Sequence, residues 1–433
     1  MKDQKGAEGS NRMSRRDFLK KTSLAGASLG TAAMFPRLAR KALAADRDYI
    51  LIGQPGAYTG PIAAMTEPSR WVAESAVAAV NKQGGIYIKE LGKNLPVRVK
   101  LVDTEGSATK AAELANRLIV RDKVDMMYPT GTPAAVNPAS VACERHGVPC
   151  VGYCPLEPWL VGGPYKWSFL FFWSVSDLVN LFTGMWDQYA DKTNKVVGGL
   201  WDNSEDGGVW AQILPKELEK LGYRVVDPGR FPLFQKDFTS SISLFKKEKV
   251  EILTGNLIPP DWATAWRQMR QQGYLPKIAT IGKAIVFPMG VNALGGNLPM
   301  GLTTELWWSP SHPFKSSLTG QSSQELAEAW TKETGKQWTQ PIGFEHTAWE
   351  IMMDSLKRAG TLNKGKIREA MAKTNLESVV GPIKFDARNF ASTPPVGGQW
   401  VKGKKWPWDL QVVYNKLNTR VPLEGKMMFP LPK

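Results

Sequence analysis

Hydrophobic and polar positions follow two alternating patterns along the chain from residue 50 onward. Short apolar runs typical of buried strands, first at 50–53 and 97–103, alternate with longer stretches whose apolar residues recur at helical spacing. The first such stretch predicts a helix over 67–83, because Pro68 suits a first helical turn and Gly84 suits a helix end. Strands that alternate with helices predict a parallel sheet covered on both faces.

This alternation runs through the chain twice. Strands at 124–128 and 148–152, with helices at 108–121 and 134–146, complete a first series. The second series has expected strands at 196–201, 223–226, 250–254 and 277–281 and helices at 209–221, 238–247 and 262–272. Later helices are expected at 345–359 and 364–373, and a hairpin at 400–410. Two successive series predict two α/β lobes.

Four short segments form more specific sequence motifs. A Tyr58-Thr59-Gly60-Pro61 turn follows the first strand, Asn81-Lys82-Gln83-Gly84-Gly85 ends the first helix, and the strand 97–103 closes on Asp103. Near the end stands Gly381-Pro382-Ile383-Lys384-Phe385-Asp386. In this order the segments resemble the extracytoplasmic solute-binding proteins of the leucine/isoleucine/valine-binding type, in the type I periplasmic binding protein family. The resemblance covers 45–386.

The resemblance implies a fold and a way of working. The expected fold is α/β, with two doubly wound Rossmann-like lobes joined by a three-strand hinge near 172–176, 300–305 and 380–384. The N-terminal lobe is expected at 45–173 plus 303–381 and the C-terminal lobe at 174–302 plus 382–433. Such proteins bind a small molecule between the lobes, close around it, and deliver it to the membrane permease of an ABC transporter. We further expect a monomer without a cofactor.

The N-terminus predicts export. Ser14-Arg15-Arg16-Asp17-Phe18-Leu19-Lys20 matches the twin-arginine motif, a weakly apolar run spans 22–35, and Ala42-Leu43-Ala44 offers a cleavage site. We therefore expect 1–44 to be a signal peptide, cleaved near Ala44, and the protein to be periplasmic. Residues 1–44 hold ten Lys or Arg and three Asp or Glu, which is +7 of the +15 net charge. The other +8 is spread along the chain, whereas a nucleic-acid-binding protein would cluster it.

The sequence gives little support for an enzyme. Its histidines, His146, His312 and His346, stand in none of the common catalytic motifs, and no phosphate-binding loop is present. Cys143, Cys150 and Cys154 lie close to His146, which raises the alternative of a metal site. Their spacing is not that of paired zinc ligands, so buried thiols, or one disulfide with an odd thiol, are the preferred interpretation. We expect no catalytic residue, metal or cofactor.

In an open α/β fold, ligands meet the loops at the carboxyl ends of the strands. In the first lobe these loops hold the candidate ligand-binding residues Tyr58, Thr59, Thr130, Gly131, Thr132, Gly152, Tyr153 and Cys154. Because Thr130 and Thr132 stand before a helix N-terminus, they could hold a carboxylate. The alternative is that they only cap the helix. The resemblance favours the ligand-binding role.

In the second lobe the equivalent loops hold the candidates Asn203, Asn256 and Lys283, followed by Glu305 and Trp307. The resemblance implies an acid in the loop 282–284, where it would pair with the ammonium of an amino-acid ligand. This chain has Lys283 and Ala284 there. A carboxylate or neutral ligand, aromatic or aliphatic, is therefore slightly preferred over a branched-chain amino acid. The alternative is that Lys283 points to solvent and that a nearby acid, Glu305 or Asp261, accepts the ammonium.

Two other functions fit the same sequence. A ligand-binding sensor subunit would share the fold and pass its signal to a membrane receptor. An exported cofactor-binding oxidoreductase would share the signal peptide.

Overall fold

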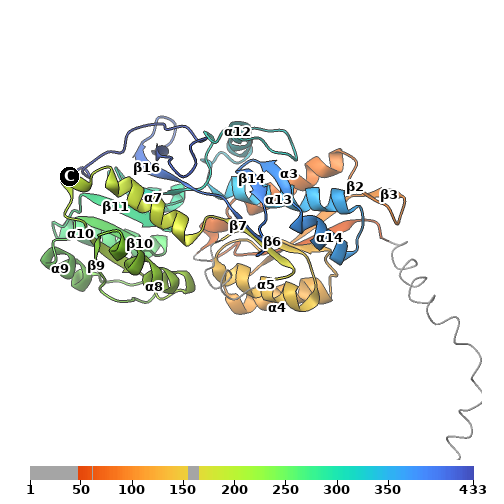
Figure 1. The fold of residues 1–433 in the computed structure, drawn as a ribbon, viewed down its shortest axis with the longest axis horizontal. Coiled ribbons are helices and arrows are strands. Elements are labelled where there is room, and N and C mark those ends of the chain that lie inside the picture. Colours follow the sequence, from red (N-terminus) through yellow and green to blue (C-terminus); the bar gives the residue numbers. More distant parts are fainter. Residues whose placement is uncertain (1–46, 61, 155–164) are drawn as a thin grey trace, which may run out of the picture. The chain divides into compact units, whose positions relative to one another are not determined.

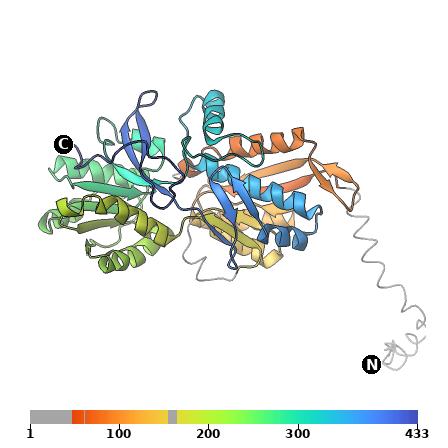
Figure 2. The ribbon, with the colours of Figure 1, turned by 45° about the horizontal axis from the view of Figure 1, so that its top comes forward.

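The computed structural model describes residues 47–60, 62–154 and 165–433. The twin-arginine motif and the cleavage site lie outside these residues. Residues 49–433 form one unit built on two separate layered sheets (Figures 1 and 2). Within the described ranges, no helix combines the length and the apolar character needed to span a bilayer.

The first sheet has six parallel strands in the order β15-β7-β6-β5-β1-β4. Its strands are β1 (Ile50–Gly56), β4 (Val97–Asp103), β5 (Met126–Met127), β6 (Cys150–Gly152), β7 (Ser168–Phe172) and β15 (Phe390–Ser392). The buried apolar runs of β1, β5, β6 and β7 match a sheet that is covered on both faces, whereas the edge strand β4 is only partly buried.

Helices cover both faces of this sheet, as the alternating pattern predicts. They are α3 (Ser69–Lys82), α4 (Ala108–Val120), α5 (Pro133–His146), α13 (Pro341–Ala359) and α14 (Lys364–Ala372), with a short η1 (Ala63–Thr66). α4 and α5 pack on one face, and α3 and α13 pack on the other (Figure 1). Two small hairpins lie beside them, β2 (Ile86–Ile88) with β3 (Lys93–Leu95) and β13 (Asn375–Ser378) with β14 (Gly381–Lys384).

The second sheet has seven strands in the order β17-β16-β12-β11-β10-β8-β9. The parallel strands are β8 (Val196–Trp201), β9 (Arg224–Val226), β10 (Ile252–Asn256), β11 (Ile278–Gly282) and β12 (Thr303–Leu306). The antiparallel β16 (Val396–Lys402) and β17 (Trp408–Tyr414) form the hairpin expected near 400–410, blue in Figure 2.

Helices also cover both faces of the second sheet. α7 (Val175–Asp187) and α8 (Glu205–Lys220) pack on one face, and α9 (Thr239–Lys247) and α10 (Pro259–Gln271) on the other. The remaining elements are η2 (Ala190–Lys192), α11 (Pro288–Asn292) and α12 (Ser323–Thr334).

The chain passes between the two sheets three times. The passages lie between β7 and β8, between β12 and α13, and between β15 and β16. The third follows Ser392, later than the expected 380–384. The reason is local pairing: Gly381–Lys384 forms an antiparallel hairpin with Asn375–Ser378, and the next strand, β15, still joins the first sheet.

Candidate functional site

One pocket is lined by loops that follow strands of both sheets. It contains about 430 Å³ of empty space, open solvent included. The first sheet and its helices contribute Met65, Thr132, Pro133, Cys154, Phe172 and Trp173. The second contributes Asp206, Trp210, Asn256, Lys283, Glu305 and Trp307. We call this the interlobe pocket. It lies at the carboxyl ends of the parallel strands, where open α/β folds bind ligands.

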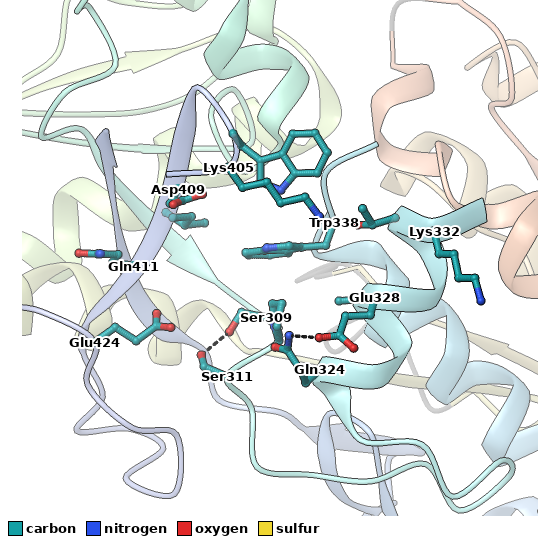
Figure 3. Close-up of a pocket in the computed structure, with 15 residues that line it drawn as sticks. Ser309, Ser311, Gln324, Glu328, Lys332, Trp338, Lys405, Asp409, Gln411 and Glu424 are labelled. Atoms are coloured by element: carbon teal, nitrogen blue, oxygen red, sulfur yellow. Dashed lines mark hydrogen bonds between the residues drawn. The ribbon is translucent and has the colours of Figure 1, made fainter. Parts of the chain in front are cut away.

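Another hollow is larger but lies elsewhere. It holds about 1340 Å³ of empty space and is lined by α12, the β16–β17 hairpin and neighbouring loops (Figure 3). Several of its polar groups already have partners: Gln324 donates to Glu328, Ser309 bonds to Ser311, and the Lys405 ammonium lies 5.2 Å from the centre of the Trp406 ring. None of the predicted site residues lines it. The interlobe pocket is therefore the better candidate.

Six of the residues predicted from the sequence meet at the interlobe pocket. They are Thr132, Cys154, Asn256, Lys283, Glu305 and Trp307. Trp173 and Trp307 are almost fully buried, and their indole N–H groups have no hydrogen-bond partner in the described part of the chain. Buried donors usually have a partner, so the Trp173 N–H is available to a ligand acceptor, whereas the Trp307 N–H lies near the Glu305 carboxylate and helps to lower its pKa.

The other predicted residues lie around the pocket rather than in its lining. Thr130 and Tyr153 are buried next to Glu345, and Gly131 accepts a hydrogen bond from the Cys154 thiol at 2.6 Å. Gly152 ends β6. Asn203 is exposed, and its backbone N–H donates to the Phe231 carbonyl.

Tyr58 and Thr59 are held at a different place. Both backbone N–H groups donate to Asp103 Oδ1, at 3.0 and 3.3 Å, and the Thr59 hydroxyl donates to Asp103 Oδ2 at 2.6 Å. These bonds join the turn that follows β1 to the last residue of β4. Tyr58 lines a separate surface hollow with Arg70 and Lys336.

Thr132 lines the interlobe pocket with its side chain unused by the helix. It precedes α5 with extended backbone geometry, and its side chain makes no capping hydrogen bond to the helix. Its hydroxyl thus remains available at the pocket. Pro133 has no N–H, and the N–H groups of Ala135 and Val136 donate to the Thr132 carbonyl, so at most the Ala134 N–H adds a main-chain donor. The Thr130 hydroxyl is not free in this way, because it donates to Glu345 Oε1 at 2.9 Å. Neither side chain therefore acts as a cap of α5.

Lys283 does not point to solvent. Its ammonium lies 2.9 Å from Asp206 Oδ2 and 3.0 Å from Oδ1, and the two side chains are only 11% and 16% exposed. Burial favours a lower pKa for Lys283, but Asp206 and Asp202 outweigh it and the pKa is raised. Burial favours a higher pKa for Asp206, but Lys283 outweighs it and the pKa is lowered. Both groups are therefore charged, and the charge of Lys283 is balanced inside the protein.

Glu305 is the second acid of the pocket. Its carboxylate accepts from Thr304 Oγ1 at 3.2 Å and from the backbone N–H of Lys283 at 3.4 Å. Burial raises the pKa of Glu305 to about 7. Gly282 leaves room for this carboxylate, since a Cβ there would lie 3.3 Å from Glu305 Oε2.

Sequence reasoning missed Asp206, Trp210, Met65, Phe172 and Trp173. It placed the helix start at 209, whereas α8 begins at Glu205 with the Ser204 hydroxyl accepting from Gly207 N–H. A serine followed by two acids is a helix-start signal, and it would have put Asp206 in the first turn. Asn256 joins this acid: with its amide oxygen facing Trp210 Nε1 at 3.1 Å, its amide nitrogen lies 3.2 Å from Asp206 Oδ2.

The three cysteines are buried free thiols. The described residues include no group of three or more His, Cys, Asp or Glu side chains arranged to hold a metal ion. His312 and His346 are buried, and burial lowers their pKa values to about 3 and about 4. Both are packing residues that bond to nearby serines.

Comparison with known proteins gives consistent matches. A family model described as periplasmic binding protein matches residues 50–404. The leucine-, isoleucine-, valine-, threonine- and alanine-binding protein of Pseudomonas aeruginosa is 23% identical over 343 residues, covering 79% of this chain and 87% of that protein.

Solved structures share the fold. A leucine-binding protein, LivK, from Thermotoga maritima has a TM-score of 0.71 at 22% identity, covering 85% of this chain and 99% of its own. A solute-binding protein of an ABC transporter from Rhodopseudomonas palustris, solved with 3,4-dihydroxybenzoic acid, has a TM-score of 0.65 at 18% identity, covering 84% and 97%. These structures confirm the predicted α/β fold with two lobes.

Proposed function

The chain belongs to the periplasmic binding protein family, and we propose that it is an extracytoplasmic solute-binding protein of an ABC transporter. It captures a small polar organic ligand in the interlobe pocket and delivers it to a membrane permease. One observation carries this proposal: loops after the parallel strands of both sheets line a single pocket. A ligand held there contacts both sheets at once and can hold them together.

The first-sheet side of the pocket suits a carboxylate. Thr132 offers a hydroxyl that the helix does not use, and it stands at the N-terminus of α5, where the helix dipole favours a negative charge. The thiol of Cys154 already donates to the Gly131 carbonyl, so Cys154 lines the pocket but offers the ligand no free donor.

The second-sheet side suits an amine. The sequence alone slightly favoured an anionic or neutral ligand because of Lys283, but Asp206 balances that charge. Glu305 is then the acid without an opposite charge directly on it. A ligand ammonium beside Glu305 would favour the ionised carboxylate.

The walls between these two ends are aromatic. Phe172, Trp173, Trp210 and Trp307 line the pocket, and Phe172 packs edge-on against Trp307 with ring centres 5.0 Å apart. Such walls favour an apolar or aromatic ligand body. The Pseudomonas aeruginosa relative is named for aliphatic amino acids, and the Rhodopseudomonas palustris structure holds an aromatic acid. An amino acid with a large apolar side chain combines both features.

The place of work follows from the family and the N-terminus. Periplasmic binding proteins act outside the cytoplasm, and the intact twin-arginine motif with Ala42-Leu43-Ala44 supports export as a folded, cleaved protein. The protein acts as a monomer that binds its ligand without converting it.

Mass spectrometry of small molecules released from the natively purified protein tests this function. A small molecule carrying a carboxylate or an amine should be recovered and should rebind to the emptied protein in calorimetry. Trp307→Ala should weaken rebinding, while an exposed control, Glu113→Gln on α4, should not. Rebinding that is unchanged in Trp307→Ala would contradict the assignment to this pocket.

A further inference from the structure

Asp206 and Lys283 form an ion pair inside the interlobe pocket. Each oxygen of Asp206 lies within 3.0 Å of the Lys283 ammonium. Asp206 is held from the other side by the Ser204 hydroxyl at 2.8 Å and by the Asn256 amide. Lys283 has a φ of 61°, a backbone conformation that few residues other than glycine adopt. Hydrogen bonds thus hold the Asp206 carboxylate, and an unusual backbone conformation sets the direction in which the Lys283 side chain leaves the loop.

Glu305 lies next to this pair. The backbone N–H of Lys283 is 3.4 Å from Glu305 Oε1, so the lysine side chain starts beside the carboxylate. Without Asp206, two further acids lie near the ammonium: Asp202, whose charge also raises the pKa of Lys283, and Glu305, which lines the pocket. The ammonium could then turn toward Glu305. Pairing with Glu305 would relieve the cost of leaving a buried ammonium without an opposite charge.

We propose that Asp206 sets the charge specificity of the pocket by holding the Lys283 ammonium away from Glu305. Glu305 then accepts the positively charged group of the ligand, so the pocket selects ligands with a primary amine over carboxylates that lack one. This inference rests on the proposed function. Asp206 is a positioning residue, because it acts on the ligand through Lys283.

Three related probes separate the possibilities. L-phenylalanine carries both charges, phenethylamine only the amine, and 3-phenylpropanoate only the carboxylate. Calorimetry should give the wild-type protein a clear preference for phenethylamine over 3-phenylpropanoate. In Asp206→Asn the ratio of these two affinities should fall at least about tenfold, because the freed lysine neutralises Glu305 and repels an amine. In Lys283→Met the preference for the amine should be kept or increased. An unchanged ratio in Asp206→Asn would overturn the proposal.

A second measurement does not depend on the probes. Carbon-13 NMR of labelled glutamate follows the titration of Glu305 in the ligand-free protein. In Asp206→Asn the lysine should turn to Glu305 and lower its pKa, and in the double variant Asp206→Asn/Lys283→Met that decrease should largely disappear. The double variant leaves no unpaired buried lysine, so it also controls for folding, which circular dichroism checks.

The outcomes distinguish this inference from the proposed function. Equal Glu305 titration in Asp206→Asn and in the double variant would overturn the positioning role even if a ligand is found. Absence of any released or bound small molecule would overturn the proposed function. The NMR result would in that case still decide whether Asp206 keeps Lys283 from Glu305.

Discussion

Thr130 donates a hydrogen bond of 2.9 Å to Glu345 Oε1, which lies 215 positions later in the chain. Ser69 bonds to the same oxygen, and the Tyr153 hydroxyl lies 3.5 Å from it. Glu345 lies on α13, is fully buried, and its second oxygen has no partner in the described part of the chain. One glutamate thus ties α13 to α3 and to two loops that the sequence predicts at the ligand site.

This glutamate should make stability depend on pH. Burial raises the pKa of Glu345 from 4.5 to about 8. Between these values the folded chain holds the proton that the unfolded chain loses, so the free energy of unfolding falls as pH rises. Glu345→Gln should make the free energy of unfolding less dependent on pH. The part of the decrease that it removes should be on the order of a few kcal/mol.

Denaturant unfolding at several pH values from 4.5 to 8.5 checks this prediction. The amide can still accept from Ser69 and Thr130, so the variant should fold. Glu113→Gln, at an exposed position on α4, is the control and should keep the wild-type slope. The same slope in Glu345→Gln would show that this carboxyl does not hold its proton.

Thr132 and Ser322 should respond in opposite ways to losing their hydroxyls. Ser322 forms a capping box with Glu325 at the start of α12, whereas the Thr132 side chain caps nothing. Thr132→Val should therefore weaken ligand binding about tenfold with little change in stability. Ser322→Ala should cost about 1 kcal/mol of stability and leave affinity unchanged. Calorimetry with the recovered ligand and thermal unfolding measure the two effects. A destabilised Thr132→Val with normal affinity would restore the capping role.

Much of the fold could be predicted from the sequence because its signals are local. The strand 196–201 and the helix ends near Ala359 and His146 depend on nearby residues, including the left-handed Gly360 and Gly147 that end those helices. The third passage between sheets depends instead on a choice between partners. Gly381–Lys384 pairs with its neighbour Asn375–Ser378, and a short strand such as Phe390–Ser392 gives little periodicity to detect.

The site was less predictable because its side chains depend on partners that are distant in the sequence. Loops after strands could be located, and three residues chosen from them, Thr132, Asn256 and Lys283, line one pocket in the structure. The direction of the Lys283 side chain could not, because it depends on Asp206, 77 positions earlier in the chain. The positive charge of Lys283 in the loop 282–284 therefore favoured an anionic ligand in the sequence analysis. In the folded pocket Asp206 balances that charge.

Export should require the arginine pair. Replacing Arg15 and Arg16 together by Lys keeps the charge but removes the receptor-read motif, so uncleaved precursor should accumulate in the cytoplasm. Fractionation followed by immunoblotting measures the distribution. Arg12→Lys, a basic residue outside the motif, is the control and should export normally. Normal export of the double variant would show that another pathway carries the protein.

Ligand binding should make the protein more compact. Asn137 on α5 donates a hydrogen bond to Glu205 on α8, a direct contact between helices that pack on different sheets. This contact and the shared pocket can form only when the two sheets approach each other. A ligand that binds the closed arrangement more tightly than the open one stabilises the closed arrangement. The gain equals the difference between the two binding free energies. Small-angle scattering should therefore give a smaller radius of gyration at saturating ligand.

Two controls make this scattering experiment decisive. A compound that does not bind in calorimetry, added at the same concentration, should leave the radius of gyration unchanged. Asn137→Ala removes the contact with Glu205 but none of the pocket lining, so it should bind with a two- to fivefold lower affinity, roughly the loss of one exposed hydrogen bond. It should still become compact once saturated. If the wild-type protein keeps the same radius with and without a tightly bound ligand, hinge closure is not how it signals occupancy to the permease.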